Sequence, residues 1–128
     1  MKLIIAGSRE FTDYELLTEM LAAKDLNADT VTEVVSGCAR GADRLGEKWA
    51  GAQGIPIARF PANWDSYGKR AGYVRNSEMA EYADACIVFW NGSSKGTKHM
   101  IDVAKRKQGM RLITVTVTPV NYVTMPEF

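Results

Sequence analysis

The sequence predicts an α/β protein in which strands and helices alternate along the chain. Short apolar runs such as KLIIA (2–6) and ACIVFW (85–90) are typical of strands that helices cover on both faces of a parallel sheet. Between such runs, apolar residues recur at helical spacing, as at Leu45, Trp49 and Ala52. Three of the strands lead into turns that contain glycine, which is the pattern of repeated strand–turn–helix units.

Five strands and four helices are expected in alternation. The expected strands are residues 2–6, 31–36, 57–60, 85–90 and 112–117, and the expected helices are residues 13–24, 42–53, 71–82 and 97–108. Residues 12–15 (TDYE) match a capping box that opens the first helix, and Gly109 ends the fourth. Residues 61–69 carry Pro, Asn, Asp, Ser and Gly and are expected to form a loop. We expect one domain over residues 1–118 and a C-terminal tail over residues 119–128.

This alternation predicts how the sheet is wound. Strands joined through helices make right-handed crossovers, which place the strands in parallel and the helices on both faces. The predicted architecture is therefore a Rossmann-like, doubly wound three-layer sandwich with a mostly parallel five-stranded sheet. The sequence does not give the strand order directly, but an order of 3-2-1-4-5 would place the reversal between the first and fourth strands. Ligands bind at such a reversal, outside the carboxyl ends of the strands.

Composition excludes several classes of function. The 128 residues are 46% hydrophobic and 24% charged, as in soluble globular domains. With 16 basic and 15 acidic residues, the net charge of +1 argues against a protein that coats nucleic acid, so a nucleic-acid partner is not expected. One histidine and no CxxC motif leave almost nothing from which to build a zinc site, and we expect no metal and no cofactor.

The compartment is expected to be the cytoplasm. The first apolar run spans four or five residues, which is far shorter than the apolar region of a signal peptide. No window approaches the ~20 apolar residues of a membrane span, so no membrane partner is expected. Cys38 and Cys86 lie on different expected elements, which favours free thiols in a reducing compartment over a disulfide framework.

Three glycine turns would crowd one crevice in a 3-2-1-4-5 sheet. They are residues 7–9, 36–41 and 91–97, each at the carboxyl end of a strand. Glycine lets the backbone approach a ligand with its N–H groups, and each following helix adds a positive dipole end, which suits a phosphate. The alternative is that these small residues only shape the turns. The candidate ligand-binding residues of the turns are Gly7, Ser8, Arg9, Ser36, Gly37, Arg40, Gly41, Gly92, Ser93, Ser94, Lys95, Gly96 and Thr97.

Two further segments could complete the site. Arg75 and Asn76, in the first turns of the third expected helix, could bind a sugar or a phosphate. The alternative is a surface Arg75 paired with Glu78. Trp64 follows a strand at the expected ligand edge and could stack on a base, whereas Trp90 could instead cap the core. The chain lacks a Walker A loop and lacks GxGxxG after its first strand, which argues against an ATPase and a dinucleotide-dependent dehydrogenase.

Six segments, taken together, carry a family resemblance: GSREF, SGCARGAD, FPANW, AGYVRNSEM, ADACIVFWNG and SSKGTKHMI. In this order they resemble the YspA-like group of the SLOG superfamily, which is related to YpsA and is often found in phage and bacterial genomes. The similarity runs from about Lys2 to Gly109. It implies a Rossmann-like fold that binds a nucleotide or a nucleotide-derived ligand. Relatives in the superfamily are the LOG phosphoribohydrolases and the DNA-processing protein DprA.

The resemblance to the LOG enzymes is incomplete at the position that matters for catalysis. Residues 75–79 match their Arg-x-x-x-Met motif, and residues 92–100 resemble their Gly-Gly-x-Gly-Thr-x-x-Glu loop. Met100 occupies the place of the glutamate, and a thioether cannot act as an acid or a base. Candidate replacements for this glutamate are Glu10, Asp43 and Glu78. Asp43 could instead simply be an acidic residue in the first turn of a helix, where the helix dipole favours negative charge. His99 could be a proton donor, but a surface histidine is the stronger interpretation. Cys38 could be a reactive thiolate, but a small residue that fills a tight turn is the stronger interpretation.

The leading hypothesis is a domain that senses or sequesters a nucleotide or nucleotide-derived small molecule. The alternative is an enzyme, a nucleoside-monophosphate N-glycosidase in which a carboxylate would stabilise the ribosyl cation. Single-stranded DNA binding, by analogy with DprA, is the weakest of the three because the net charge is close to zero. A homodimer or a higher homo-oligomer is left open, with the tail as a possible participant.

Overall fold

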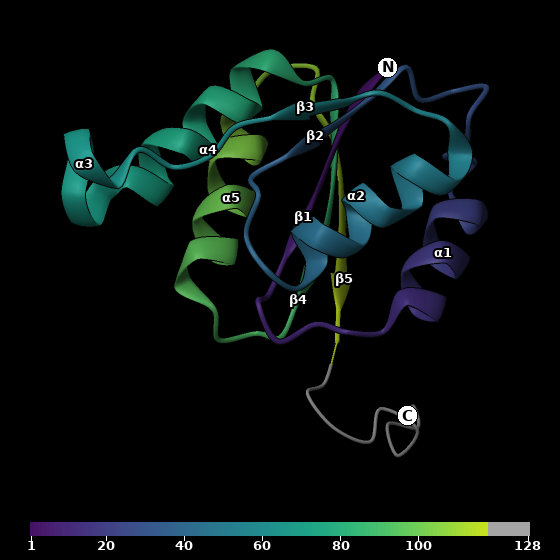
Figure 1. Cartoon of the computed structure of the whole chain (residues 1–128), viewed down its shortest axis with the longest axis horizontal. Helices are drawn as coiled ribbons and strands as arrows, with labels where there is room; N and C mark the ends of the chain where they lie inside the picture. The colour runs from purple at the N-terminus through teal and green to yellow at the C-terminus, as the bar shows by residue number, and fades with distance from the viewer. Residues whose placement is uncertain (118–128) are drawn as a thin grey trace.

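Five parallel strands form one sheet in the order β3-β2-β1-β4-β5 in the computed structural model, which describes residues 1–117 (Figure 1). The strands are β1 (Lys2–Gly7), β2 (Glu33–Ser36), β3 (Ile57–Arg59), β4 (Ala85–Trp90) and β5 (Arg111–Thr116). The central strand β1 pairs with both β2 and β4, and Ile4 lies opposite Val35 and Cys86. The expected α/β architecture is confirmed, and the strand order is the one that places the reversal between β1 and β4.

Helices cover both faces of this sheet. They are α1 (Tyr14–Ala23), α2 (Ala42–Gln53), α3 (Trp64–Tyr67), the 3₁₀ helix η1 (Gly68–Arg70), α4 (Ala71–Tyr82) and α5 (Lys95–Arg106). Figure 1 shows α1 and α2 on one side, α4 and α5 on the other, and α3 projecting away from the sheet. Successive residues of β1 serve the two layers alternately: Leu3 and Ile5 belong to the apolar cluster with α1 and α2, and Ile4 and Ala6 belong to the cluster with α4 and α5.

Two helices begin at residues other than those expected. Asp13, not Thr12, caps α1, because its carboxylate accepts a hydrogen bond from the backbone N–H of Leu16 at 2.9 Å. The expected capping box was therefore misplaced by one residue. Helix α5 begins at Lys95 rather than at Thr97, since Ser94 is its N-cap.

The expected loop at residues 61–69 was also wrong in part. Residues 64–70 form α3 and η1, and the Asn63 side chain caps α3 by accepting from the N–H of Ser66 at 3.1 Å. This short helical segment leads directly into α4 and carries Trp64 to the side of the sheet where β1 and β4 end. The composition of residues 61–69 indicates a loop and does not reveal that Asn63 caps a short helix that begins at Trp64.

The described residues cover nearly all of the expected domain. Residue 118 and the expected tail at residues 119–128 lie outside the described residues. Within residues 1–117, no helix combines the length and the apolar character needed to cross a membrane.

Candidate functional site

A cavity of about 260 Å³ lies at the carboxyl ends of β1 and β4, where the strand order reverses. Nine of the predicted site residues line it: Gly7, Arg9, Asp43, Trp64, Arg75, Asn76, Ser94, Gly96 and Thr97. A second hollow of about 340 Å³ adjoins it over the turn after β2 and shares Arg9, Trp64 and Arg75 with it. This second hollow adds Gly37 and Arg40 from the predicted set. Residues from three turns and from α4 therefore meet in one groove.

Eight predicted residues line neither hollow: Ser8, Glu10, Ser36, Gly41, Glu78, Gly92, Ser93 and Lys95. The two buried serines among them make hydrogen bonds within the protein instead of facing the hollows. The Ser8 hydroxyl accepts from the N–H of Asn91 at 3.1 Å, and the Ser36 hydroxyl donates to Glu47 at 2.6 Å. Glu10 is exposed and forms an ion pair with Arg40 at 3.1 Å.

In the turn after β2, nearby side chains accept hydrogen bonds from two of the backbone N–H groups. The N–H of Cys38 donates to the Ser36 hydroxyl at 3.1 Å, and the N–H of Ala39 donates to Oδ2 of Asp43 at 3.1 Å. Two of the N–H groups expected to face a phosphate therefore already have partners. Gly37 is required here for space, because a Cβ at this position would lie 2.5 Å from Nη1 of Arg75 and 2.8 Å from Oδ2 of Asp43.

Asp43 places a carboxylate in the wall of the cavity. The residue is only 5% exposed, and burial raises its pKa to about 6. The hydrogen bond from Ala39 and the positive charge of Arg75 act in the opposite direction. Oδ2 accepts the Ala39 N–H, whereas Oδ1 has no hydrogen-bond donor among the described residues. One acceptor atom of a buried carboxylate is thus left available.

Arg75 and Asn76 connect α4 to the turns on either side of the cavity. The Arg75 guanidinium donates to the carbonyl oxygen of Gly37 and, through Nε, to Oδ1 of Asn76 at 3.0 Å. Burial lowers the pKa of Arg75, and the nearby Asp43 carboxylate opposes that shift. The side-chain amide of Asn76 donates to the carbonyl oxygen of Gly96 at 3.2 Å. Arg75 is therefore a half-buried site residue and is not the surface partner of Glu78.

His99 is held by two neighbours of the same region. Its Nδ1 lies 3.2 Å from the side-chain nitrogen of Asn76, and its ring stacks on Tyr73 with the ring centroids 4.2 Å apart. Partial burial and the charge of Arg106 lower the pKa of His99, so the neutral imidazole is favoured. His99 acts here as a packed polar residue that joins α4 to α5.

The N-terminus of α5 faces the cavity with unoccupied donors. Oδ1 of Asn91 accepts from the N–H groups of Ser93 and Ser94, and the Ser94 hydroxyl accepts from the N–H of Thr97. The N–H groups of Lys95 and Gly96 have no acceptor among the described residues. Because Gly96 lines the cavity, the positive end of the α5 dipole is presented to whatever occupies it.

Sequence reasoning missed several residues of the wall, and chiefly Tyr73, Lys69, Gly72 and Ala39. Tyr73 shares a helical face with Asn76 at a spacing of three residues, so that periodicity was a usable signal. Lys69 was hidden because its segment was expected to be a loop. Met100, which stands where the LOG enzymes carry glutamate, is buried and lines the cavity. Trp90 lies outside both hollows and donates to the carbonyl oxygen of Ser94 at 3.1 Å.

Comparison with known proteins agrees with this architecture. Residues 1–67 match the family model described as YAcAr, the YspA, cpYpsA-related SLOG family. The chain belongs to this family. It is also 34% identical over 111 residues to the Gene 61 protein of Mycobacterium phage D29, and the match covers 82% of this chain and 89% of that protein. No solved structure matches the chain significantly.

The family assignment bears on the site in two ways. Membership of the SLOG family is consistent with binding or processing of a nucleotide-related ligand. The matched residues contain the turns after β1 and β2, whereas α4 and α5 lie beyond them. Within the described part of the chain, no cluster of three or more His, Cys, Asp or Glu residues is arranged to hold a metal ion.

Proposed function

We propose that this protein binds a nucleotide or a nucleotide-derived ligand in the cavity at the carboxyl ends of β1 and β4. One observation carries the proposal: Gly96, whose N–H has no acceptor among the described residues, and Arg9 line the same cavity. Backbone N–H groups at a helix N-terminus together with an arginine are a recurrent phosphate site.

The phosphate is expected beside Gly96 and Arg9. Arg9 is exposed, and within residues 1–117 its guanidinium makes no ion pair, so it keeps all its donors for a ligand. Arg75 supports the same region, although two of its donors already bond Gly37 and Asn76. The turn after β2 contributes less than its glycines suggest, because the N–H groups of Cys38 and Ala39 are already engaged.

The base is expected at the rim, where two aromatic side chains are exposed. Trp64 is 55% exposed and Tyr73 is 45% exposed, and both line the cavity. Each base stacked on such an aromatic face contributes roughly 1–3 kcal/mol. The groove thus offers donors for a phosphate and flat apolar surfaces for a base.

Calorimetry against a panel of nucleoside mono-, di- and triphosphates, with inorganic phosphate alongside, tests this proposal. We expect saturable binding of at least one nucleotide, tighter than inorganic phosphate because the base adds stacking contacts. Circular dichroism of the same sample checks that the fold is intact. A folded protein that binds no phosphorylated compound would contradict the proposal.

One observation favours hydrolysis as a second candidate function. Of the three candidate carboxylates, Asp43 alone lines the cavity, whereas Glu10 and Glu78 are exposed and lie outside it. A carboxylate beside a bound sugar can stabilise the positive charge that develops when an N-glycosidic bond breaks. The test is chromatography for free base after incubation with nucleoside monophosphates. Release that Asp43→Asn abolishes would support hydrolysis, and intact nucleotide after prolonged incubation would leave binding as the function.

A further inference from the structure

The polar groups of the cavity are divided between two walls. The α5 wall offers N–H donors at its helix N-terminus, and the α2 wall offers the Asp43 carboxylate. An ionised carboxylate repels a phosphate group, and this repulsion is strong where water is excluded. A phosphate therefore sits on the α5 side, and the part of the ligand that reaches Asp43 must carry hydrogen-bond donors.

The Asp43 carboxylate has an acceptor to offer such a donor. Its Oδ1 has no donor among residues 1–117, although the side chain is only 5% exposed. The nearest cation is Arg75, but no ion pair within 4.0 Å joins the two side chains in this part of the chain. Arg75 instead directs its donors to Gly37 and Asn76. A buried acceptor without a partner is costly, and a ligand hydroxyl would remove that cost.

The sugar hydroxyls of a nucleotide would supply the hydrogen-bond donor that Asp43 lacks. The sugar lies between the phosphate and the base, and in ribose it carries two adjacent hydroxyl donors. The aromatic surfaces suited to the base, on Trp64 and Tyr73, are exposed at the rim, whereas Asp43 is buried in the wall. Gly37 leaves space beside this carboxylate, because any Cβ there would contact Oδ2 of Asp43.

We infer that Asp43 accepts hydrogen bonds from the ribose hydroxyls, so that the site selects ribonucleotides over 2′-deoxyribonucleotides. This inference rests on the proposed function and specifies the class of ligand. A charge-assisted hydrogen bond in a buried site is among the stronger polar contacts, so losing one hydroxyl should be measurable. Burial raises the pKa of Asp43 to about 6, and Glu47 of α2 acts in the same direction. The hydrogen bond from Ala39, Arg75 of α4 and Arg9 of the turn after β1 act against that shift, so the carboxylate is ionised at pH 7.5.

The test is calorimetry with a ribonucleoside monophosphate and its 2′-deoxy analogue at pH 7.5. For the unmodified protein we expect the ribonucleotide to bind about 10-fold more tightly or better. In Asp43→Asn, which keeps an acceptor for the Ala39 N–H, the preference should fall below about 3-fold. Asp102→Asn, at a carboxylate of α5 that pairs with Lys98 at 3.1 Å, is the control and should keep the full preference.

The outcomes separate the two proposals. Equal affinity for the two nucleotides, or a preference that Asp43→Asn leaves intact, overturns the inference while binding itself stands. Absence of binding by both nucleotides and by inorganic phosphate overturns the proposed function and the inference together. The comparison of the two ligands on the unmodified protein needs no variant, so a folding defect in Asp43→Asn does not obscure it.

Discussion

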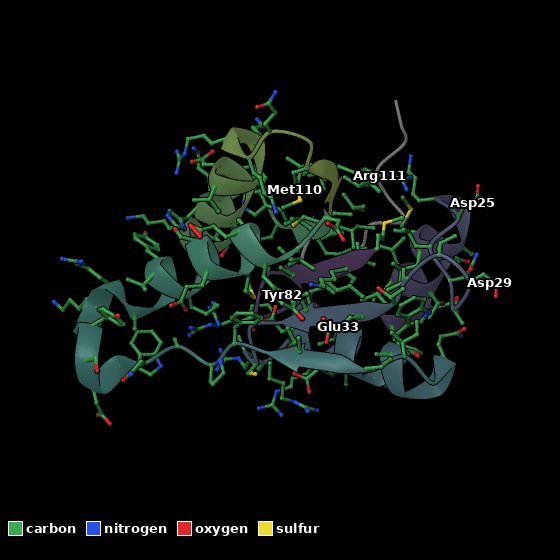
Figure 2. All side chains as sticks on the ribbon, turned by 90° about the horizontal axis from the view of Figure 1, so that it is seen from above. Asp25, Asp29, Glu33, Tyr82, Met110 and Arg111 are labelled. Atoms are coloured by element: carbon green, nitrogen blue, oxygen red, sulfur yellow. The ribbon has the colours of Figure 1, made fainter. Side chains whose placement is uncertain are left out.

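The two ends of the sheet differ in whether their polar and charged groups have partners within the fold. At the amino ends of the strands, the Tyr82 hydroxyl donates to Glu33, and the Lys2 ammonium lies 4.1 Å from the centroid of the Tyr82 ring. Figure 2 labels Tyr82 and Glu33 near each other. Lys107 donates to the carbonyl oxygens of Glu81 and Ala83. Polar groups at this end find their partners within the fold. The hydrogen bonds of Tyr82 with Glu33 and of Lys107 with Glu81 are exposed, so they are weakened by water.

At the carboxyl ends of the strands, several polar groups lack a hydrogen-bond or ion-pair partner among the described residues. Asp43 is buried with one free oxygen, Arg9 is unpaired among the described residues, and the N–H of Gly96 has no acceptor there. The buried Asp43 oxygen without a donor lowers the stability of the folded state, whereas Arg9 and Gly96 are exposed to water and carry no such cost. This difference is what the proposed function predicts: one end of the sheet serves stability, and the other keeps hydrogen-bonding groups for a ligand.

The largest expected effect is a gain in stability when the buried charge is removed. The pKa of Asp43 rises from 3.8 to about 6 on folding, which corresponds to a cost of about 3 kcal/mol when the group is ionised. Asp43→Asn should therefore raise the free energy of unfolding at pH 7.5 by up to about 3 kcal/mol. Urea unfolding followed by circular dichroism measures this change.

The pH dependence of that gain has a definite sign. Between pH 3.8 and about 6 the folded protein holds the Asp43 proton while the unfolded chain has lost it. The contribution of this group to stability therefore falls as the pH rises through this window and stays low above it. The advantage of Asp43→Asn should shrink toward zero near pH 4. A variant that is less stable than the parent protein at pH 7.5 would show that the carboxylate serves the fold.

The next effect concerns the unpaired cation at the carboxyl ends. Arg9→Ala should weaken nucleotide binding by about 1.5–3 kcal/mol, which is a factor of about 10 to 150, because it removes a charge-assisted contact to the phosphate. Calorimetry measures the affinity. The control is Arg106→Ala, in the last turn of α5, which removes an equal charge at the far end of that helix. Equal losses in the two variants would mean that only the net charge matters.

A smaller effect is expected at the start of α5. Gly96→Ala should stabilise the helix by up to about 1 kcal/mol, yet weaken nucleotide binding about 5- to 10-fold, because its methyl group enters the cavity. A Cβ at Gly96 meets no atom within 4 Å, so the fold accepts it. Gly51→Ala is the matched control: this glycine of α2 is equally unobstructed and lies outside both hollows. If Gly96→Ala leaves the affinity unchanged, the phosphate does not approach the α5 N-terminus.

The smallest effect is expected at the amino ends. Tyr82→Phe removes the hydroxyl that donates to Glu33 but keeps the ring beneath Lys2. Because this contact is exposed, the melting temperature should fall by less than it changes in Asp43→Asn, the one substitution at a buried residue. Nucleotide affinity should not change at all. A loss of affinity in Tyr82→Phe would mean that the two ends of the sheet are coupled.

The fold was accessible from the sequence because apolar periodicity reports burial directly. Runs such as 2–6 and 85–90 are covered on both faces, as their apolar pattern predicted. Arg9 and Gly96, which line the cavity, were accessible because turns after parallel strands meet at one edge of the sheet.

Other features depended on local side-chain hydrogen bonds that residue type alone does not assign. The hydrogen bonds of Ser36 with Cys38 and of Asp43 with Ala39 take up N–H groups that the glycine-containing turn was expected to offer a ligand. The Asn63 side chain caps the short helix α3. Each of these partners lies two to four residues away in the chain, but a polar side chain in a turn has several backbone groups within reach, and the sequence does not say which one it binds.

The most direct measurement is a titration of the ¹⁵N-labelled protein with a ribonucleoside monophosphate, followed by amide chemical shifts. The largest changes should fall on the N–H groups of Arg9, Ala39 and Gly96, which border the cavity, while Lys2 and Glu33 at the amino ends stay unchanged. Changes centred on the amino ends, or no changes at any amide at millimolar nucleotide, would contradict a nucleotide site at the carboxyl ends of the sheet.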